Sequence, residues 1–142
     1  MRKRLLVLFL LLPALFFSAA AQSHPDPAGA QPFVPIVKYL TLGDAESMSA
    51  WFADNLEISM LGHATMATRF QARQILSAFF DRNSPVSFDI NYVSGRSNMK
   101  YALGRLYAGG EYFLVSLFVR RRADGGFLVE QLKIDRERRQ TL

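Results

Sequence analysis

The second half of this 142-residue chain is built from apolar stretches that alternate with polar residues and are separated by glycine pairs. From Val86 to Tyr92, apolar residues occupy every second position, which is typical of a strand with one buried face. Three further stretches follow, namely Met99 to Tyr107, Tyr112 to Val119 and Phe127 to Ile134. Ala108-Gly109-Gly110 and Ala123-Asp124-Gly125-Gly126 read as hairpin turns between them. The four stretches therefore predict an antiparallel meander.

The first half carries helix signals. Pro35 suits the start of a helix that Gly43 ends, and Asp44 is a suitable N-cap for a second helix, which we expect to run to about Ala53. A short strand is predicted over Leu56–Leu61, ended by Gly62. Thr68-Arg69-Phe70-Gln71 then fits a capping box, and the helix behind it is expected to end near Asn83.

These elements predict an α+β fold in which three N-terminal helices pack on a curved, mainly antiparallel sheet. A sheet that curves around helices forms a cone with an open end, where a pocket is expected. We assign the single domain to residues 33–136 and a charged tail to 137–142.

The N-terminus has the three parts of a secretory signal. Arg2-Lys3-Arg4 precedes the apolar run Leu5–Phe17, and small residues 18–21 follow, so cleavage is expected before Gln22. The run is shorter than the roughly 20 residues that span a bilayer, so residues 1–21 are expected to leave and no transmembrane segment to remain. Residues 22–32 read as a flexible leader. The mature protein is expected in the periplasm or outside the cell, and we do not expect a lipoprotein because the chain has no Cys.

The order of elements resembles the nuclear-transport-factor-two-like, or cystatin-like, α+β cone. Several segments resemble, more closely, a family of secreted bacterial proteins described as domain of unknown function 4783. The segments are Gly43-Asp44 with Trp51-Phe52, the run from Thr68 through Phe80, Tyr101-Ala102-Leu103-Gly104, and Gln131-Leu132-Lys133-Ile134. The resemblance covers about residues 34–136 and implies export and a small domain, but it implies no reaction.

The sequence lacks the residue patterns that most kinds of catalytic or metal site require. The two histidines, His24 in the leader and His63 in a predicted turn, have no second ligand at metal spacing, so we expect no metal site and no cofactor. We assign no catalytic residue. Arg120-Arg121-Arg122 is a basic run without interleaved aromatic residues, and we expect no nucleic-acid partner.

A pocket in the cone would be lined by a few polar and aromatic side chains. The candidates are Trp51, Tyr92, Tyr101, Ser116 and Glu130. Strand parity leaves two interpretations of the last strand. Either Glu130 and Leu132 point to the inner face, or Val129 and Gln131 point to it. A buried carboxylate there would be a candidate acid.

The leading hypothesis is an exported, non-enzymatic domain that binds a small ligand or a protein. The alternative is an isomerase- or hydrolase-type enzyme that uses Glu130 or Asp89 in the cone pocket. A third interpretation is a homodimer formed through the outer face of the sheet.

The first prediction concerns processing. The exported protein should begin at or near Gln22, because the small residues before it suit signal peptidase. Mass spectrometry of the exported product measures this. A product that retains residues 1–21 would instead indicate a membrane anchor.

Overall fold

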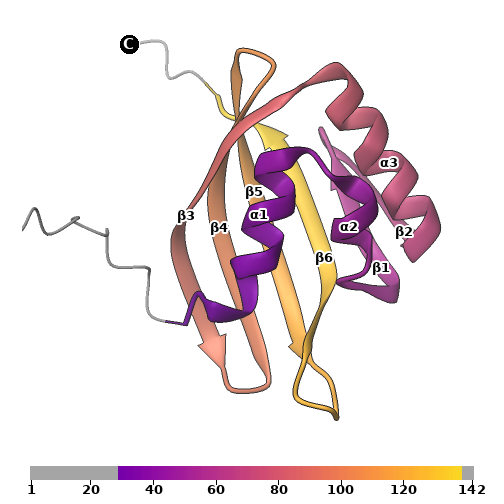
Figure 1. The fold of residues 1–142 in the computed structure, drawn as a ribbon, viewed down its shortest axis with the longest axis vertical. Helices are drawn as coiled ribbons and strands as arrows, with labels where there is room; N and C mark the ends of the chain where they lie inside the picture. Colours follow the sequence, from indigo (N-terminus) through magenta and orange to yellow (C-terminus); the bar gives the residue numbers. More distant parts are fainter. Residues whose placement is uncertain (1–28, 139–142) are drawn as a thin grey trace, which may run out of the picture.

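The computed structural model describes residues 29–138, so the predicted signal segment lies outside the described residues. The helices are the 3₁₀ turn η1 (Gln31–Phe33), α1 (Val34–Leu42), α2 (Ala45–Ser49) and α3 (Arg69–Arg82). The strands are β1 (Phe52–Met60), β2 (His63–Thr68), β3 (Pro85–Arg96), β4 (Met99–Ala108), β5 (Glu111–Arg121) and β6 (Phe127–Arg136). The chain is an α+β fold, with helices before the first strand and between β2 and β3 (Figure 1).

The strands form one open, mixed sheet in the order β2-β1-β6-β5-β4-β3. The predicted meander β3 to β6 is confirmed as antiparallel, and β1 pairs antiparallel with β2. β6 is not an edge strand, because β1 pairs with it in parallel. β5 and β6 are therefore interior strands, in agreement with the apolar character of Tyr112 to Val119.

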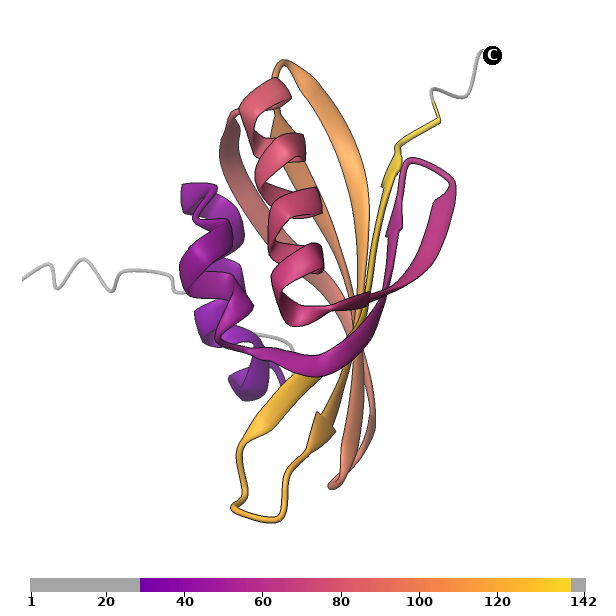
Figure 2. The same cartoon turned by 90° about the vertical axis from the view of Figure 1, so that its right-hand side faces the viewer.

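All three α-helices cover the same face of the sheet (Figure 2). We call this the inner face, and the opposite side the outer face. α1 packs against β3, while α3 packs against β1 and α2. The core between the layers is closed by side chains from both. Phe79 of α3 meets Phe113 of β5 edge to face, with ring centroids 5.0 Å apart at 84°.

Local chemistry sets the helix ends. Gly43 takes a left-handed φ of 67° at the end of α1, a conformation that glycine adopts without strain. Asp44 caps α2 by accepting hydrogen bonds from the Ser47 hydroxyl and amide, and these bonds lower the pKa of Asp44. The predicted capping box is present, since Thr68 accepts from the Gln71 amide and the Gln71 side chain accepts from the Thr68 amide.

The prediction for the second helix was wrong at its end. α2 stops at Ser49, and Phe52 already belongs to β1, where its side chain is fully buried. The carbonyl of Trp51 accepts a hydrogen bond from the Val129 amide at 2.7 Å. Pairing with β6 therefore replaces the last helical turn.

The sequence also failed to predict β2. The prediction of a turn at His63 was wrong, because His63 pairs with Met60 in the β1–β2 hairpin. Of the six β2 residues, Ala67 is the buried one, so the strand shows no apolar alternation.

Phe79→Ala should lower the free energy of unfolding by about 3–5 kcal/mol, because it leaves a cavity under β5. Phe70→Ala is a matched control on the same helix, since that side chain is 57% exposed. Urea unfolding measures both. Equal effects of the two substitutions would contradict the assigned core face of α3.

Candidate functional site

Four of the five predicted pocket residues lie on the outer face of the sheet. They are Tyr92 on β3, Tyr101 on β4, Ser116 on β5 and Glu130 on β6. Trp51 is half-buried at the junction of α2 and β1, so it lies apart from the other four. The structure thus brings most of the candidates to one surface and not into a cavity of the cone.

A register shift in β3 turns Tyr92 outward. From Ser87 to Ile90 the strand keeps the predicted alternation, and Phe88 lies in the core, but Val86 is exposed at an earlier register shift between Pro85 and Ser87. The shift between Ile90 and Tyr92 adds one residue, so Tyr92 pairs with the outward Leu103 and is 53% exposed.

A second register shift answers the question of strand parity in β6. Phe118 pairs with Gln131 but Val119 pairs with Val129, which leaves Glu130 as the extra residue. Both Val129 and Leu132 are consequently buried on the inner face. Neither of the two parity interpretations holds for the whole strand.

Glu130 points to the outer side of this bulge and forms an ion pair. Both carboxylate oxygens accept from Nε of Arg120 at 3.0 Å. The two side chains are 37% and 48% exposed, so the pair is a surface interaction. Asp89 is also exposed, and it lies opposite Arg105 in the β3–β4 register.

Within residues 29–138 no carboxylate is buried on the inner face. Among residues 29–138, the buried polar side chains are Ser49 and Ser59. Every buried side-chain nitrogen or oxygen in this range has a hydrogen-bond partner. In the same range no three His, Asp or Glu side chains gather closely enough to hold a metal ion. Nor is any helix there long and apolar enough to cross a bilayer.

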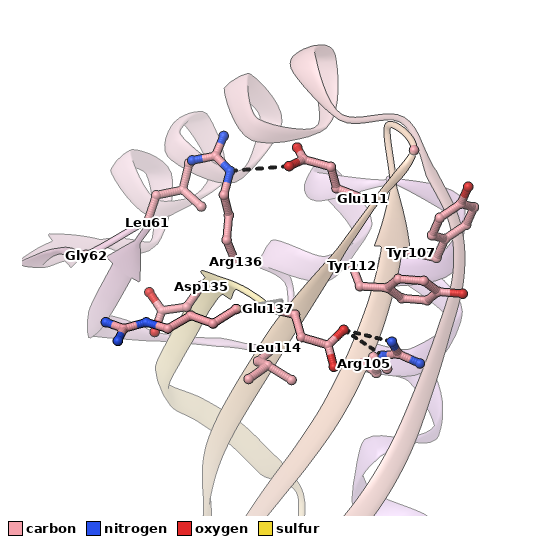
Figure 3. Close-up of a pocket in the computed structure, with 12 residues that line it drawn as sticks. Leu61, Gly62, Arg105, Tyr107, Glu111, Tyr112, Leu114, Asp135, Arg136 and Glu137 are labelled. Atoms are coloured by element: carbon pink, nitrogen blue, oxygen red, sulfur yellow. Dashed lines mark hydrogen bonds and ion pairs between the residues drawn. The ribbon is translucent and has the colours of Figure 1, made fainter. Parts of the chain in front are cut away.

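The outer face is hollowed at one end of the sheet (Figure 3). The open hollow has a volume of about 1450 Å³ and lies between the β1–β2 turn, the β4–β5 turn and the end of β6. Its lining includes Arg105, Tyr107, Tyr112, Leu114 and Glu137. Aromatic, aliphatic and charged side chains therefore meet there.

Arg105 organises the hollow. Its guanidinium lies over the ring of Tyr112 at 3.7 Å from the centroid, and Glu137 accepts from its Nε and Nη2 at 3.0 and 2.8 Å. The ring of Tyr112 in turn packs on Tyr107 with centroids 4.8 Å apart. This stack fixes the aromatic rings and leaves charged donors and acceptors at its rim.

The family model for Domain of unknown function (DUF4783) matches residues 33–135. The chain belongs to the DUF4783 family. The search of curated proteins finds no match.

Solved structures agree on the fold of this DUF4783 domain. A family protein from Bacteroides uniformis has 20% identity and a TM-score of 0.70, covering 74% of this chain and 96% of that one. One from Bacteroides fragilis has 22% identity and a TM-score of 0.69, covering 73% and 97%. A putative dehydratase from the NTF2-like family of Streptomyces avermitilis has 11% identity and a TM-score of 0.59, covering 78% and 94%. At these identities the likeness extends to the fold alone, which is NTF2-like.

Sequence reasoning missed the residues of the hollow. Tyr112 and Leu114 are 44% and 46% exposed on an interior strand. The signal that could have found them is the apolar character of both faces of Tyr112 to Val119. Within residues 29–138 the helices cover only the inner face of the sheet, so the outer side chains of this strand stay exposed.

Glu130→Gln in this DUF4783 domain should change the free energy of unfolding by less than about 0.5 kcal/mol, because exposed ion pairs contribute little. Urea unfolding near neutral pH measures it, with Arg120→Gln as the matched control for the other partner. An increase in the free energy of unfolding above about 1 kcal/mol would indicate that the Glu130 carboxylate is strained and desolvated. That result would support the enzyme alternative.

Proposed function

We propose that the mature chain is an exported, non-enzymatic module that acts by binding another protein chain through the outer face of its sheet. The observation that supports this most directly is the set of exposed apolar side chains on that face. They are Tyr92, Leu103, Tyr112 and Leu114, with exposed fractions of 53%, 37%, 44% and 46%. Contiguous exposed apolar surface marks contact sites in otherwise soluble domains.

The pairing register places these side chains beside one another or beside other aromatic residues. Tyr92 lies opposite Leu103, Tyr112 lies opposite Tyr107, and Tyr101 lies opposite Phe118. Aromatic residues are enriched at protein interfaces because a rigid ring buries much area at a low entropic cost. The strands hold this patch in place, so a partner would meet a preformed surface.

The partner we propose for this face is a second copy of the chain. Three ion pairs on the face are made within the chain, namely Arg105–Glu137, Arg120–Glu130 and Lys133–Asp135. Because these charges already neutralise one another, two copies of the same surface can meet without strong like-charge repulsion. A two-fold dimer buries the same patch on both copies.

The enzyme alternative has less support. General acid–base chemistry needs a carboxylate whose pKa is moved by burial or by a close neighbouring charge. Glu130 and Asp89 lie on the outer face, and Glu130 is engaged by Arg120. The NTF2-like fold is shared with a protein named as a putative dehydratase, but that likeness is one of fold.

Leu103→Lys should weaken self-association through this face by about tenfold or more, because it places two like charges near each other in the dimer and removes apolar area. Leu42→Lys is the matched control, since Leu42 is 64% exposed on α1, on the helical side of the molecule. Sedimentation equilibrium measures the dissociation constant. An effect of Leu42→Lys equal to that of Leu103→Lys would contradict the proposed face.

A further inference from the structure

The strand β2 forms one edge of the sheet and has none of the usual protection of an edge. Within residues 29–138 it pairs with β1 alone, so its other side presents backbone N–H and C=O groups that no described strand meets. Its sequence, His63-Ala64-Thr65-Met66-Ala67-Thr68, contains no Lys, Arg, Asp, Glu or Pro. Met66 is 66% exposed. Natural proteins usually place charges, prolines or bulges on such an edge to prevent pairing with another chain.

The opposite edge shows what β2 lacks. β3 begins with Pro85, which has no N–H to donate, and it contains Asp89 and Arg96. It is also interrupted by two register shifts, one between Pro85 and Ser87 and one between Ile90 and Tyr92. The β3 edge thus carries several features that oppose pairing with another chain, and the β2 edge carries none of them.

We propose that β2 pairs antiparallel with β2 of a second copy, about a two-fold axis. Pairing covers the open edge of both copies at once. The joined sheet then ends on β3 at both sides, and those edges are guarded, so the pairing stops at two copies. A second copy is also the one strand donor that is present wherever the chain is present.

The sequence of β2 permits this pairing. Side chains directly opposite in an antiparallel pair share a face, so the axis must pass through a residue, for example Thr65, which sets Ala64 opposite Met66 of the second copy. No formally charged Lys, Arg, Asp or Glu is then opposed to its own kind. Small Ala64 and Ala67 allow close approach, while β-branched Thr65 and Thr68 suit a strand.

Apolar surface next to the strand would be covered as well. Phe70 lies two residues beyond the end of β2 in the first turn of α3, and it is 57% exposed. Met66 on the strand and Phe70 just beyond its end are thus both exposed apolar side chains. Together they supply side-chain contact to add to the backbone hydrogen bonds.

This inference is independent of the outer-face proposal, and one series of variants separates the two. Sedimentation equilibrium is measured on the full mature chain, on Met66→Lys, on Leu103→Lys and on the double variant. Lys on an edge strand opposes pairing, and the exposure of Met66 lets the substitution be made without disturbing the core. Val86→Lys is the matched control, since Val86 is 63% exposed on the guarded strand β3.

If both surfaces pair copies, the unchanged chain forms an assembly larger than a dimer, each single variant is a dimer and the double variant is a monomer. Met66→Lys should raise the dissociation constant of its interface at least about tenfold, and Val86→Lys should leave it unchanged. A mass that Met66→Lys does not lower overturns the inference and leaves the outer-face proposal intact. A mass lowered by Met66→Lys but not by Leu103→Lys supports the inference and overturns the outer-face proposal.

Hydrogen exchange tests the backbone contact directly. Amides of residues 63–68 should become more protected as the concentration of the unchanged chain rises, and Met66→Lys should abolish that change. Protection that is the same at all concentrations and unchanged by Met66→Lys would overturn the inference, because it would mean that the edge is either never covered or covered by another segment of the same chain.

Discussion

The structure depends on an inner sheet face that stays apolar across β1 and β3 to β6, because the helices bury their apolar sides against that one face. Phe113 and Leu106 from the sheet meet Phe79 and Leu76 from α3 in a core whose members are almost fully buried. Close packing also explains Gly104 in β4. A Cβ there would lie 2.4 Å from Cζ of Phe88, so any larger residue would force that ring out of the core.

The register shifts between Ile90 and Tyr92 in β3 and beside Glu130 in β6 preserve this apolar face where the sequence alternation breaks. In β6 the extra residue is Glu130, and placing it outside lets both Val129 and Leu132 point inward. A carboxylate on the inner face would lose its hydration among apolar side chains, which costs several kcal/mol without compensation. Glu130 keeps its hydration and gains Arg120 by lying outside. The need for an apolar inner face thus keeps carboxylates out of the core and places polar and aromatic side chains on the outer face.

The features that could be predicted from sequence are those set by neighbouring residues. The Gly43-Asp44 junction, the Thr68 capping box and the glycine hairpins depend on local backbone chemistry, and all are present. The features that could not be predicted depend on distant partners. α2 ends early because β6 binds the backbone of Trp51, and β2 exists because β1 pairs with it although its own side chains are small and exposed. The sequence around Glu130 did not show which side of the strand faces the core. A bulge divides this strand, and alternation along the sequence does not reveal a bulge.

Glu130 lies outside the cone while its neighbour Val129 lies inside it. Because the chain has no Cys, single cysteines at these two positions report their exposure without interference. The rate of reaction with a thiol reagent should be close to that of the unfolded chain for Glu130→Cys, and it should be strongly suppressed until unfolding for Val129→Cys, which replaces a fully buried side chain of similar size. Fast labelling of Val129→Cys together with protection of Glu130→Cys in the folded protein would contradict the account and return a carboxylate to the interior of the cone.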